Sequence, residues 1–299
     1  MVSLQEIVDE KKLIIVDGSI KETSSFLWNI YGIKSFGDLD LESIDSEIDY
    51  MENFLELIRI PELKTIPGVT NEIKAYLDGV ITKISYLSKI ENGKNQGGFK
   101  CRKIKKSRRK NKRDSWENSQ GNEDGKQKLE ELRQALTCVY KEFKRSEINI
   151  NDSSYDLLVD MVKLVSESIG LKNDTGEFYG QNPKNPDDSD VDEKLTATVY
   201  WHALCKERSS RVLTADGDFV GLLGITPRLL GADDLMPYNK VFRERVSKYP
   251  FKLYYGRGRE YETKINELPE FCKKFMIYKK NLEENKKIKE KMLELWKKF

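Results

Sequence analysis

One stretch of the sequence, Asp190–Leu223, constrains the fold more than any other. Asp192 is followed by apolar residues three, seven and eleven positions later, and this spacing predicts a helix with one buried face and an acid in its first turn. Arg211–Thr214 is too short for a helix and apolar at its centre, which predicts a buried strand. Asp216 and Asp218 follow that strand directly. A helix followed by a buried strand with acids at its carboxyl end predicts a parallel α/β fold.

The rest of the chain alternates short apolar segments with longer segments of helical periodicity. Leu13–Val16 is a continuous aliphatic run that ends in Asp17, as expected of a central parallel strand followed by a turn. The other predicted strands are Leu63–Val69, Ile148–Ile150 and Pro250–Tyr255. Apolar residues three and four positions apart predict helices over Leu41–Ile58, from a capping Thr70 to Leu87, over Lys128–Phe143 and over Ser154–Ile169, and a helical turn over Phe219–Leu223.

The chain of 299 residues is long enough for one large domain or two ordinary ones. We expect one α/β domain over residues 1–260, interrupted at residues 92–126 by a flexible insertion rich in Gly, Asn, Gln and Ser. Residues 261–299 keep the apolar spacing of three and four between many lysines, which predicts an amphipathic C-terminal helix. Such a helix packs on the domain or on a partner subunit, with contact to a membrane surface as the alternative.

Charge is distributed unevenly along the chain. The 52 basic and 50 acidic residues leave a formal net charge of +2, yet ten of the fourteen residues in Lys100–Arg113 are basic. The remainder of the chain therefore carries a net charge of −8. Such a run is common as a solvated segment or a nuclear localisation signal, and beside an acidic body it also fits a tether for a polyanion such as RNA.

The cysteines favour a reducing compartment. They lie far apart, with no CxxC pair for a metal and no spacing typical of a small disulfide framework. The first residues are mixed in charge and lack the apolar core of a secretory leader, and no run approaches the length that crosses a bilayer. We therefore expect a cytoplasmic protein without a membrane segment. The four cysteines are Cys101, Cys138, Cys205 and Cys272.

The single histidine, His202, restricts the possible chemistry. One histidine excludes a two-histidine ribonuclease and a histidine-rich zinc site, and it excludes a serine triad unless His202 serves it. Its helical neighbours Val199 and Ala203 instead favour a packed or surface histidine.

Four acids come from four separate segments: Asp17, Glu72, Asp192 and Asp216. In a parallel sheet with crossover helices all four would lie at the carboxyl edge, where open α/β sheets bind ligands. Two carboxylates about 4 Å apart repel by roughly 4 kcal/mol at an effective dielectric near 20, so a cluster needs cations or shifted pKa values. Ligation by acidic oxygens alone suits Mg²⁺ or Mn²⁺.

Each of these acids also has an ordinary structural role open to it. Asp17 fits a helix cap or a turn, and Glu72 fits the negative charge that is common in a helix's first turn. Asp190 and Glu193, three residues apart, fit a helix-capping arrangement and stay outside the predicted site.

Four segments of the chain resemble the PIN-domain nucleases. They are LIIVDGS, IPGVTNEI, DVDEKLTA and VLTADGDF, and they occur in the order of that family. The last two are the most specific, because they combine an acid three residues before an aliphatic and five before an alanine with a strand that ends Thr-x-Asp-x-Asp. The resemblance covers Leu13–Ser19, Ile66–Leu77, Glu147–Ile169 and Asp190–Leu223.

The resemblance implies a three-layer α/β/α sandwich with a five-stranded, mainly parallel sheet and metal-dependent cleavage of RNA or, less often, DNA. Carried over by position, Asp17, Glu72, Asp192 and Asp216 would be the catalytic, metal-binding acids. Asp218 would be an auxiliary metal ligand, and Ser19 a hydrogen-bonding neighbour. The expected cofactor is Mg²⁺ or Mn²⁺, and the expected partner is RNA. A protein inhibitor and a homo-oligomer are further possible partners.

Two hypotheses compete with an active ribonuclease. The first is a nucleic-acid-binding scaffold that keeps the fold but does not cleave, with the basic insertion as its contact. The second is a phosphatase of the haloacid dehalogenase type, which also places an acid after the first strand. That chemistry needs a second acid two residues after Asp17, and the sequence has Ser19 there.

Overall fold

The structure, a computed structural model, describes residues 2–3, 7, 12–17, 40–96, 111–172, 178–181, 190–232, 235, 237–256, 260–264, 275–277 and 282–299. The chain forms two compact units. A sheet unit comprises Met1–Lys21, Ile60–Thr70 and Ser146–Phe299, and a helical unit comprises Glu22–Arg59 and Asn71–Arg145. This division differs from the expected one into residues 1–260 and 261–299.

The sheet unit is built on a six-stranded sheet in the order β1-β8-β7-β6-β2-β3. The four neighbours β7, β6, β2 and β3 run parallel to one another. At one edge β8 pairs antiparallel with β7, and β1 pairs antiparallel with β8. The predicted α/β class with a parallel sheet is therefore confirmed, while the sheet has six strands rather than five. The strands are β1 (Val2–Ser3), β2 (Leu13–Val16), β3 (Leu63–Lys64), β6 (Ser210–Thr214), β7 (Phe251–Tyr255) and β8 (Glu260–Lys264).

Burial explains why the central strands form where the apolar runs predicted them. Every residue of β2 and of β6 is buried, as expected of parallel strands covered on both faces. Their register pairs Ile15 with Val212 and Val16 with Leu213. These two fully buried strands thus lie side by side, and the residues that follow them meet at one edge.

The predicted strand at Ile148–Ile150 is wrong. The chain makes only an isolated parallel bridge between Thr65 and Glu147, supported by a hydrogen bond of 2.8 Å from the Ile148 amide to the Thr65 carbonyl. Ile148 and Ile150 are only partly buried, unlike the residues of a central strand. Asp152 already caps the next helix, so few residues remain between the bridge and that helix.

The predicted strand Leu63–Val69 and the helix cap at Thr70 are also wrong in part. The strand β3 ends at Lys64, and helix α4 (Pro67–Gln96) begins three residues before the expected cap. Proline suits the first helical position, because its fixed backbone angle is helical and its missing amide has no partner there anyway. Thr70 is instead a buried residue inside the helix.

Among the described residues, the sheet unit also contains the helices α6 (Ser153–Glu167), α7 (Val191–Leu204), α8 (Gly217–Leu230) and α9 (Tyr238–Lys248). The helix predicted after Asp190 is confirmed as α7, and the turn predicted at Phe219–Leu223 is the middle of the longer α8. Within α7 all residues are buried except Asp192 and Lys194. Only its first turn therefore reaches the surface.

Of the described residues within 261–299, only the last part forms the predicted helix. Residues 260–264 belong to β8, and β9 (Phe275–Ile277) pairs with β4 (Ile169–Lys172) in a second, three-stranded sheet that also contains β5 (Phe178–Gln181). Strand pairing prevails over the helical spacing at β9. The helix α10 (Leu282–Lys298) follows.

The C-terminal helix belongs to the sheet unit because aromatic side chains attach it to α9. Trp296 is buried and stacks on Tyr238, with ring centroids 6.0 Å apart and an interplanar angle of 5°. It also meets Phe242 edge-on at 6.1 Å. Among the described residues, no helix is long and apolar enough to cross a membrane.

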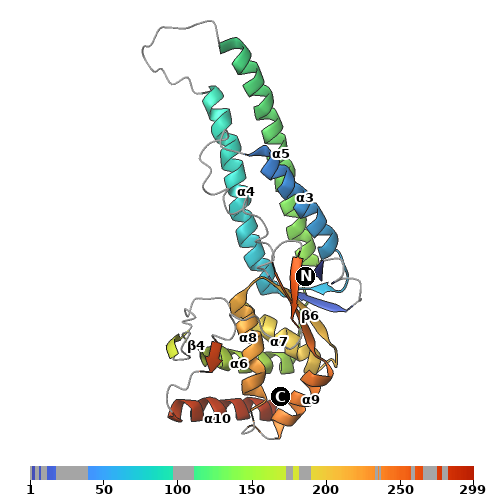
Figure 1. Ribbon diagram of the computed structural model, residues 1–299, viewed down its shortest axis with the longest axis vertical. Coiled ribbons are helices and arrows are strands. Elements are labelled where there is room, and N and C mark those ends of the chain that lie inside the picture. The colour runs from blue at the N-terminus through green and yellow to red at the C-terminus, as the bar shows by residue number, and fades with distance from the viewer. Residues whose placement is uncertain are drawn as a thin grey trace. The chain divides into compact units, whose positions relative to one another are not determined.

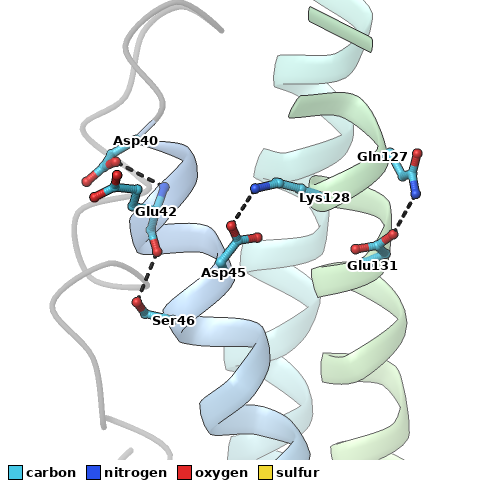
Figure 2. A network of polar contacts seen from close by, with 7 residues as sticks. All are labelled: Asp40, Glu42, Asp45, Ser46, Gln127, Lys128 and Glu131. Atoms are coloured by element: carbon cyan, nitrogen blue, oxygen red, sulfur yellow. Dashed lines mark hydrogen bonds and ion pairs between the residues drawn. The ribbon is translucent and has the colours of Figure 1, made fainter. Parts of the chain in front are cut away.

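The helical unit contains α3 (Leu41–Ile58), most of α4 and α5 (Asn111–Arg145), with α3 and α5 side by side (Figure 1). Phe54 of α3 and Phe143 of α5 are both buried, and their ring centroids lie 5.7 Å apart. On the exposed side Lys128 of α5 forms an ion pair with Asp45 of α3 (Figure 2). The helix predicted over Leu41–Ile58 is thus confirmed.

The expected irregular insertion at residues 92–126 is wrong where the structure describes it. Residues 92–96 continue α4, and residues 111–126 form the first half of α5. Both segments contain many poor helix formers such as Asn and Gly, so helix propensity does not explain why α4 and α5 extend this far. Most of the basic run Lys100–Arg113 lies outside the described residues.

Candidate active site

Asp17 stands directly after the buried strand β2, as the sequence predicted. Its side chain is only 4% exposed, and its amide donates a hydrogen bond of 3.1 Å to the carbonyl of Leu213 in β6. One carboxylate oxygen, Oδ2, accepts a hydrogen bond of 2.8 Å from the hydroxyl of Thr214. The acid at the end of β2 is therefore bound to the end of β6 through both its backbone and its side chain.

The hydroxyl of Thr214 also reaches the second predicted acid. The Asp216 amide donates a hydrogen bond of 2.9 Å to Thr214 Oγ1, so this hydroxyl donates to Asp17 and accepts from Asp216. The structure brings Asp17 and Asp216 to a single buried hydroxyl group, although they lie 199 positions apart in the sequence. Sequence reasoning passed over Thr214, which the pattern Thr-x-Asp already contained.

Asp216 also caps a helix. Its Oδ1 accepts a hydrogen bond of 2.8 Å from the amide of Asp218, and α8 begins at the residue between them. This is the ordinary structural role of an aspartate before a helix. A carboxylate has two oxygens with several acceptor sites, so the cap leaves Asp216 able to bind a further group.

Asp218 lies in the first turn of α8. Most of its surface is exposed, yet the carboxyl group loses part of its hydration, and this desolvation and then the charge of Asp216 raise its pKa. A carboxyl group whose pKa is raised by a neighbouring negative charge favours the binding of a cation or a proton. The auxiliary acid of the sequence prediction is therefore close enough to Asp216 to interact with its charge.

The first turn of α7 holds Asp192, which is half-buried. The preceding residue, Val191, packs so tightly on Gly68 that a Cβ atom on this glycine would lie 2.6 Å from Val191 Cγ2. Gly68 is the second residue of α4. The amino ends of α4 and α7 are therefore in direct contact.

The predicted capping arrangement of Asp190 and Glu193 is wrong. Asp190 makes no side-chain cap and instead pairs with Lys163 at 3.0 Å and Lys194 at 2.7 Å. In place of the backbone amides at the start of α7, the Asp190 carboxylate therefore binds two ammonium groups. They lower the pKa of Asp190 against the opposing effect of burial. The side chain of Glu193 is buried, with only 2% of the residue exposed.

Glu72 is the sixth residue of α4 and belongs to the helical unit. Its place beside the acids of the sheet unit therefore stays a prediction. Ser19 lies outside the described residues.

His202 takes no part in this group of acids. It is 9% exposed, near the carboxyl end of α7, and its ring meets Trp201 edge-on at 5.0 Å. Burial, with smaller contributions from Arg208 and Lys206, lowers its pKa to about 4. The prediction of a packed histidine is confirmed.

The donors at this edge are suited to a hard cation. They are carboxylate and hydroxyl oxygens, which is the chemistry that Mg²⁺ and Mn²⁺ prefer. Among the described residues, no three His, Cys, Asp or Glu side chains are grouped closely enough to hold a metal ion. The structure thus has a pair of acids joined by Thr214 and two further acids in the first turns of α7 and α8.

The strand order places this pair at a distinctive point of the sheet. The bridge to Thr65 makes Glu147 a fifth parallel position, beside β3. Across the sheet the order is then Glu147, β3, β2, β6 and β7, which come third, second, first, fourth and fifth along the chain. The order reverses between β2 and β6. Ligands of open α/β sheets bind outside the carboxyl ends of the strands at such a reversal, and Asp17 and Thr214 are the residues located there.

No protein-family model matches the chain, and no curated protein or solved structure matches it either. The likeness to PIN-domain nucleases therefore rests on the four sequence segments.

Proposed function

We propose that the protein is a Mg²⁺- or Mn²⁺-dependent endonuclease that hydrolyses RNA, and less readily DNA, on a PIN-like three-layer fold. The observation that carries this proposal is the shared hydrogen bonding of Asp17 and Asp216 to Thr214 at the reversal of strand order. Thr214 holds Asp17 by its carboxylate and Asp216 by its backbone amide, and it thereby keeps the two acidic residues near each other.

The proposal assigns the acids distinct tasks. Asp17, buried and oriented by Thr214, and Asp216, oriented by the start of α8, would hold the cation. Asp192 would supply a further oxygen, and Asp218 would act as an auxiliary ligand. Once bound, Mg²⁺ or Mn²⁺ supplies a more acidic water molecule and positive charge beside the phosphate.

The surroundings of the proposed site would also limit its contact with water and the choice of catalytic base. Asp17 follows the buried strand β2 and is only 4% exposed, so most of its side chain is shielded from water. His202, the single histidine, packs against Trp201 near the other end of α7, so a carboxylate is the expected base within this site.

RNA is the proposed substrate because the chain combines these acids with the basic run Lys100–Arg113. Ten positive charges attract a polyanion without regard to its sequence. Replacing the ten basic residues by Gln should flatten the salt dependence of RNA binding and raise KM with little change in kcat, since a tether binds substrate and transition state alike. An unchanged salt slope would assign the run to targeting or solubility.

Cleavage of single-stranded and structured RNA in Mg²⁺ or Mn²⁺, with EDTA as control, tests the proposal directly. Asp17→Asn, Asp192→Asn and Asp216→Asn should abolish cleavage and leave the fold intact, because the amide keeps the shape but loses the charge. Asp190→Asn is a matched control, since its carboxylate pairs with two lysines outside the proposed site.

Metal binding gives a second readout that is independent of cleavage. A cation that binds only the folded chain raises the Tm of the wild type, and this shift should disappear in Asp216→Asn. RNA binding without cleavage and without a metal-dependent shift would instead identify a nucleic-acid-binding scaffold.

A further inference from the structure

The turn formed by residues 65–69, which runs from the end of β3 through the first residues of α4, contacts both of the segments that carry Asp17 and Asp192. On one side Thr65 is fully buried, and its hydroxyl donates a hydrogen bond of 3.1 Å to the carbonyl of Val16, the residue before Asp17. On the other side Gly68 packs on Val191, the residue before Asp192. The turn therefore lies between the backbones that precede the two acids.

The turn has little freedom to move. The Thr65 amide donates to the Ser146 carbonyl at 3.2 Å, and the Thr65 carbonyl accepts from the Ile148 amide at 2.8 Å. Ile66 and Val69 are buried, and Pro67 has a fixed backbone angle. A change of volume at Gly68 must therefore be absorbed by α7 rather than by the turn itself.

The contact at Gly68 is limited to one methyl group. A Cβ atom at this position would lie 2.6 Å from Val191 Cγ2, but 3.6 Å from Val191 Cβ and 3.8 Å from Cγ1, which are ordinary contacts. Valine is restricted to one side-chain rotamer in a helix, and Val191 is 5% exposed, so rotation of the methyl group out of the way is disfavoured. Removing this methyl group would remove the whole conflict.

We propose that Gly68 is a positioning residue, which sets the separation of Asp17 and Asp192 by allowing the first turn of α7 to approach the end of β2. Any side chain at position 68 pushes Val191, and with it Asp192, away from the turn that is bound to the Asp17 segment. This inference rests on the proposed function for its catalytic consequence only, since the separation itself is a structural quantity.

Two single variants and a double variant test the inference. Gly68→Ala should lower kcat about 100-fold with KM nearly unchanged, because a displacement of about 1 Å at a catalytic group has effects of this size. Val191→Ala alone should retain most of the activity. The double variant, Gly68→Ala with Val191→Ala, should recover kcat, since the new methyl group then meets Val191 Cβ at an ordinary distance.

Gly231→Ala is the matched control for loss of stability. A Cβ atom there would lie 2.7 Å from the carbonyl oxygen of Pro227, a conflict as severe as that at Gly68. Gly231 follows the last residue of α8, whose 14 residues span about 20 Å from the acids at its start. This variant should lose thermal stability and keep kcat.

Crystal structures of the wild type, Gly68→Ala and the double variant provide a readout that does not depend on activity. The Cα separation of Asp17 and Asp192 should grow in Gly68→Ala and return in the double variant. An unchanged separation, or a double variant that does not restore it, would overturn the inference. If the separation responds as expected while the wild type cleaves no RNA, the proposed function fails and the positioning role stands.

Discussion

The sheet unit and the helical unit differ in how they bury charge. Among the described residues, the sheet unit encloses the acids Asp17 and Glu193 and the guanidinium of Arg211, each at most 4% exposed, whereas the helical unit encloses Glu47 alone. Burying a charged group costs several kcal/mol unless it is paired and hydrogen-bonded. Asp17 accepts a hydrogen bond from Thr214 and Arg211 donates one to the Ile7 carbonyl, so the sheet unit offsets part of this cost by buried hydrogen bonds.

The helical unit uses its charges differently. Its helices meet through apolar and aromatic side chains such as Phe54 and Phe143, and its ion pairs, such as Lys128 with Asp45, lie at the surface. Exposed ion pairs of that kind contribute little to the free energy of unfolding.

The largest effect is expected from the apolar interior of the helical unit. Phe143→Ala should destabilise that unit by about 3–5 kcal/mol, because it removes a fully buried ring and leaves a cavity. Unfolding followed by circular dichroism at 222 nm should show the helical unit melting earlier. RNA cleavage should survive below that transition, and a simultaneous loss of cleavage would show that the two units do not act separately.

Acid should weaken the sheet unit through His202. Its pKa is lowered to about 4 in the folded chain, against 6.5 as the ordinary value, so the unfolded chain takes up the proton first as the pH falls. The free energy of unfolding should decrease between pH 6.5 and about pH 4, by at most about 3 kcal/mol from this group.

The His202→Gln variant isolates that contribution. The difference in unfolding free energy between wild type and variant should change across this pH range and be constant above it. A difference that is flat from pH 7 to pH 4 would contradict the assignment of this titration to His202.

The shared hydroxyl of the site should have a smaller effect on stability and a large one on activity. Thr214→Val keeps the shape but removes the donor to Asp17 and the acceptor for the Asp216 amide, which should cost about 1–3 kcal/mol. Metal-dependent cleavage should also decrease in Thr214→Val. Thr214→Ser retains the hydroxyl and should restore most of the cleavage, whereas equal loss in both variants would point to packing by the methyl group.

The smallest effect is expected from the surface ion pair of the helical unit. Lys128→Ala removes the partner of Asp45 on the exposed side of α3 and α5 (Figure 2). Its change in Tm should be close to the error of a melting curve and should vanish at high salt, because exposed charges are screened. A large change that persists in high salt would show that this unit, too, depends on specific charge pairs.

Several predictions from the sequence failed at segments where two local preferences compete. The spacing at Phe275 suits a helix, yet pairing with β4 makes it a strand. Thr70 suits a helix cap, yet Pro67 starts the helix earlier. Asp190 suits a cap, yet Lys163 on another helix takes its carboxylate. In each of these segments a partner or a neighbouring residue decides between two conformations that the local sequence permits.

The sequence by itself determined the buried strands at Leu13–Val16 and Arg211–Thr214, the helix that begins after Asp190, and the acids at their ends, because apolar runs and helical spacing are local properties. Only the tertiary structure decided that β2 and β6 are neighbours and that Thr214 joins Asp17 to Asp216. It also decided that Gly68 meets Val191. Contacts between residues more than a hundred positions apart depend on how the strands order themselves in the sheet, and no local pattern in the chain records that order.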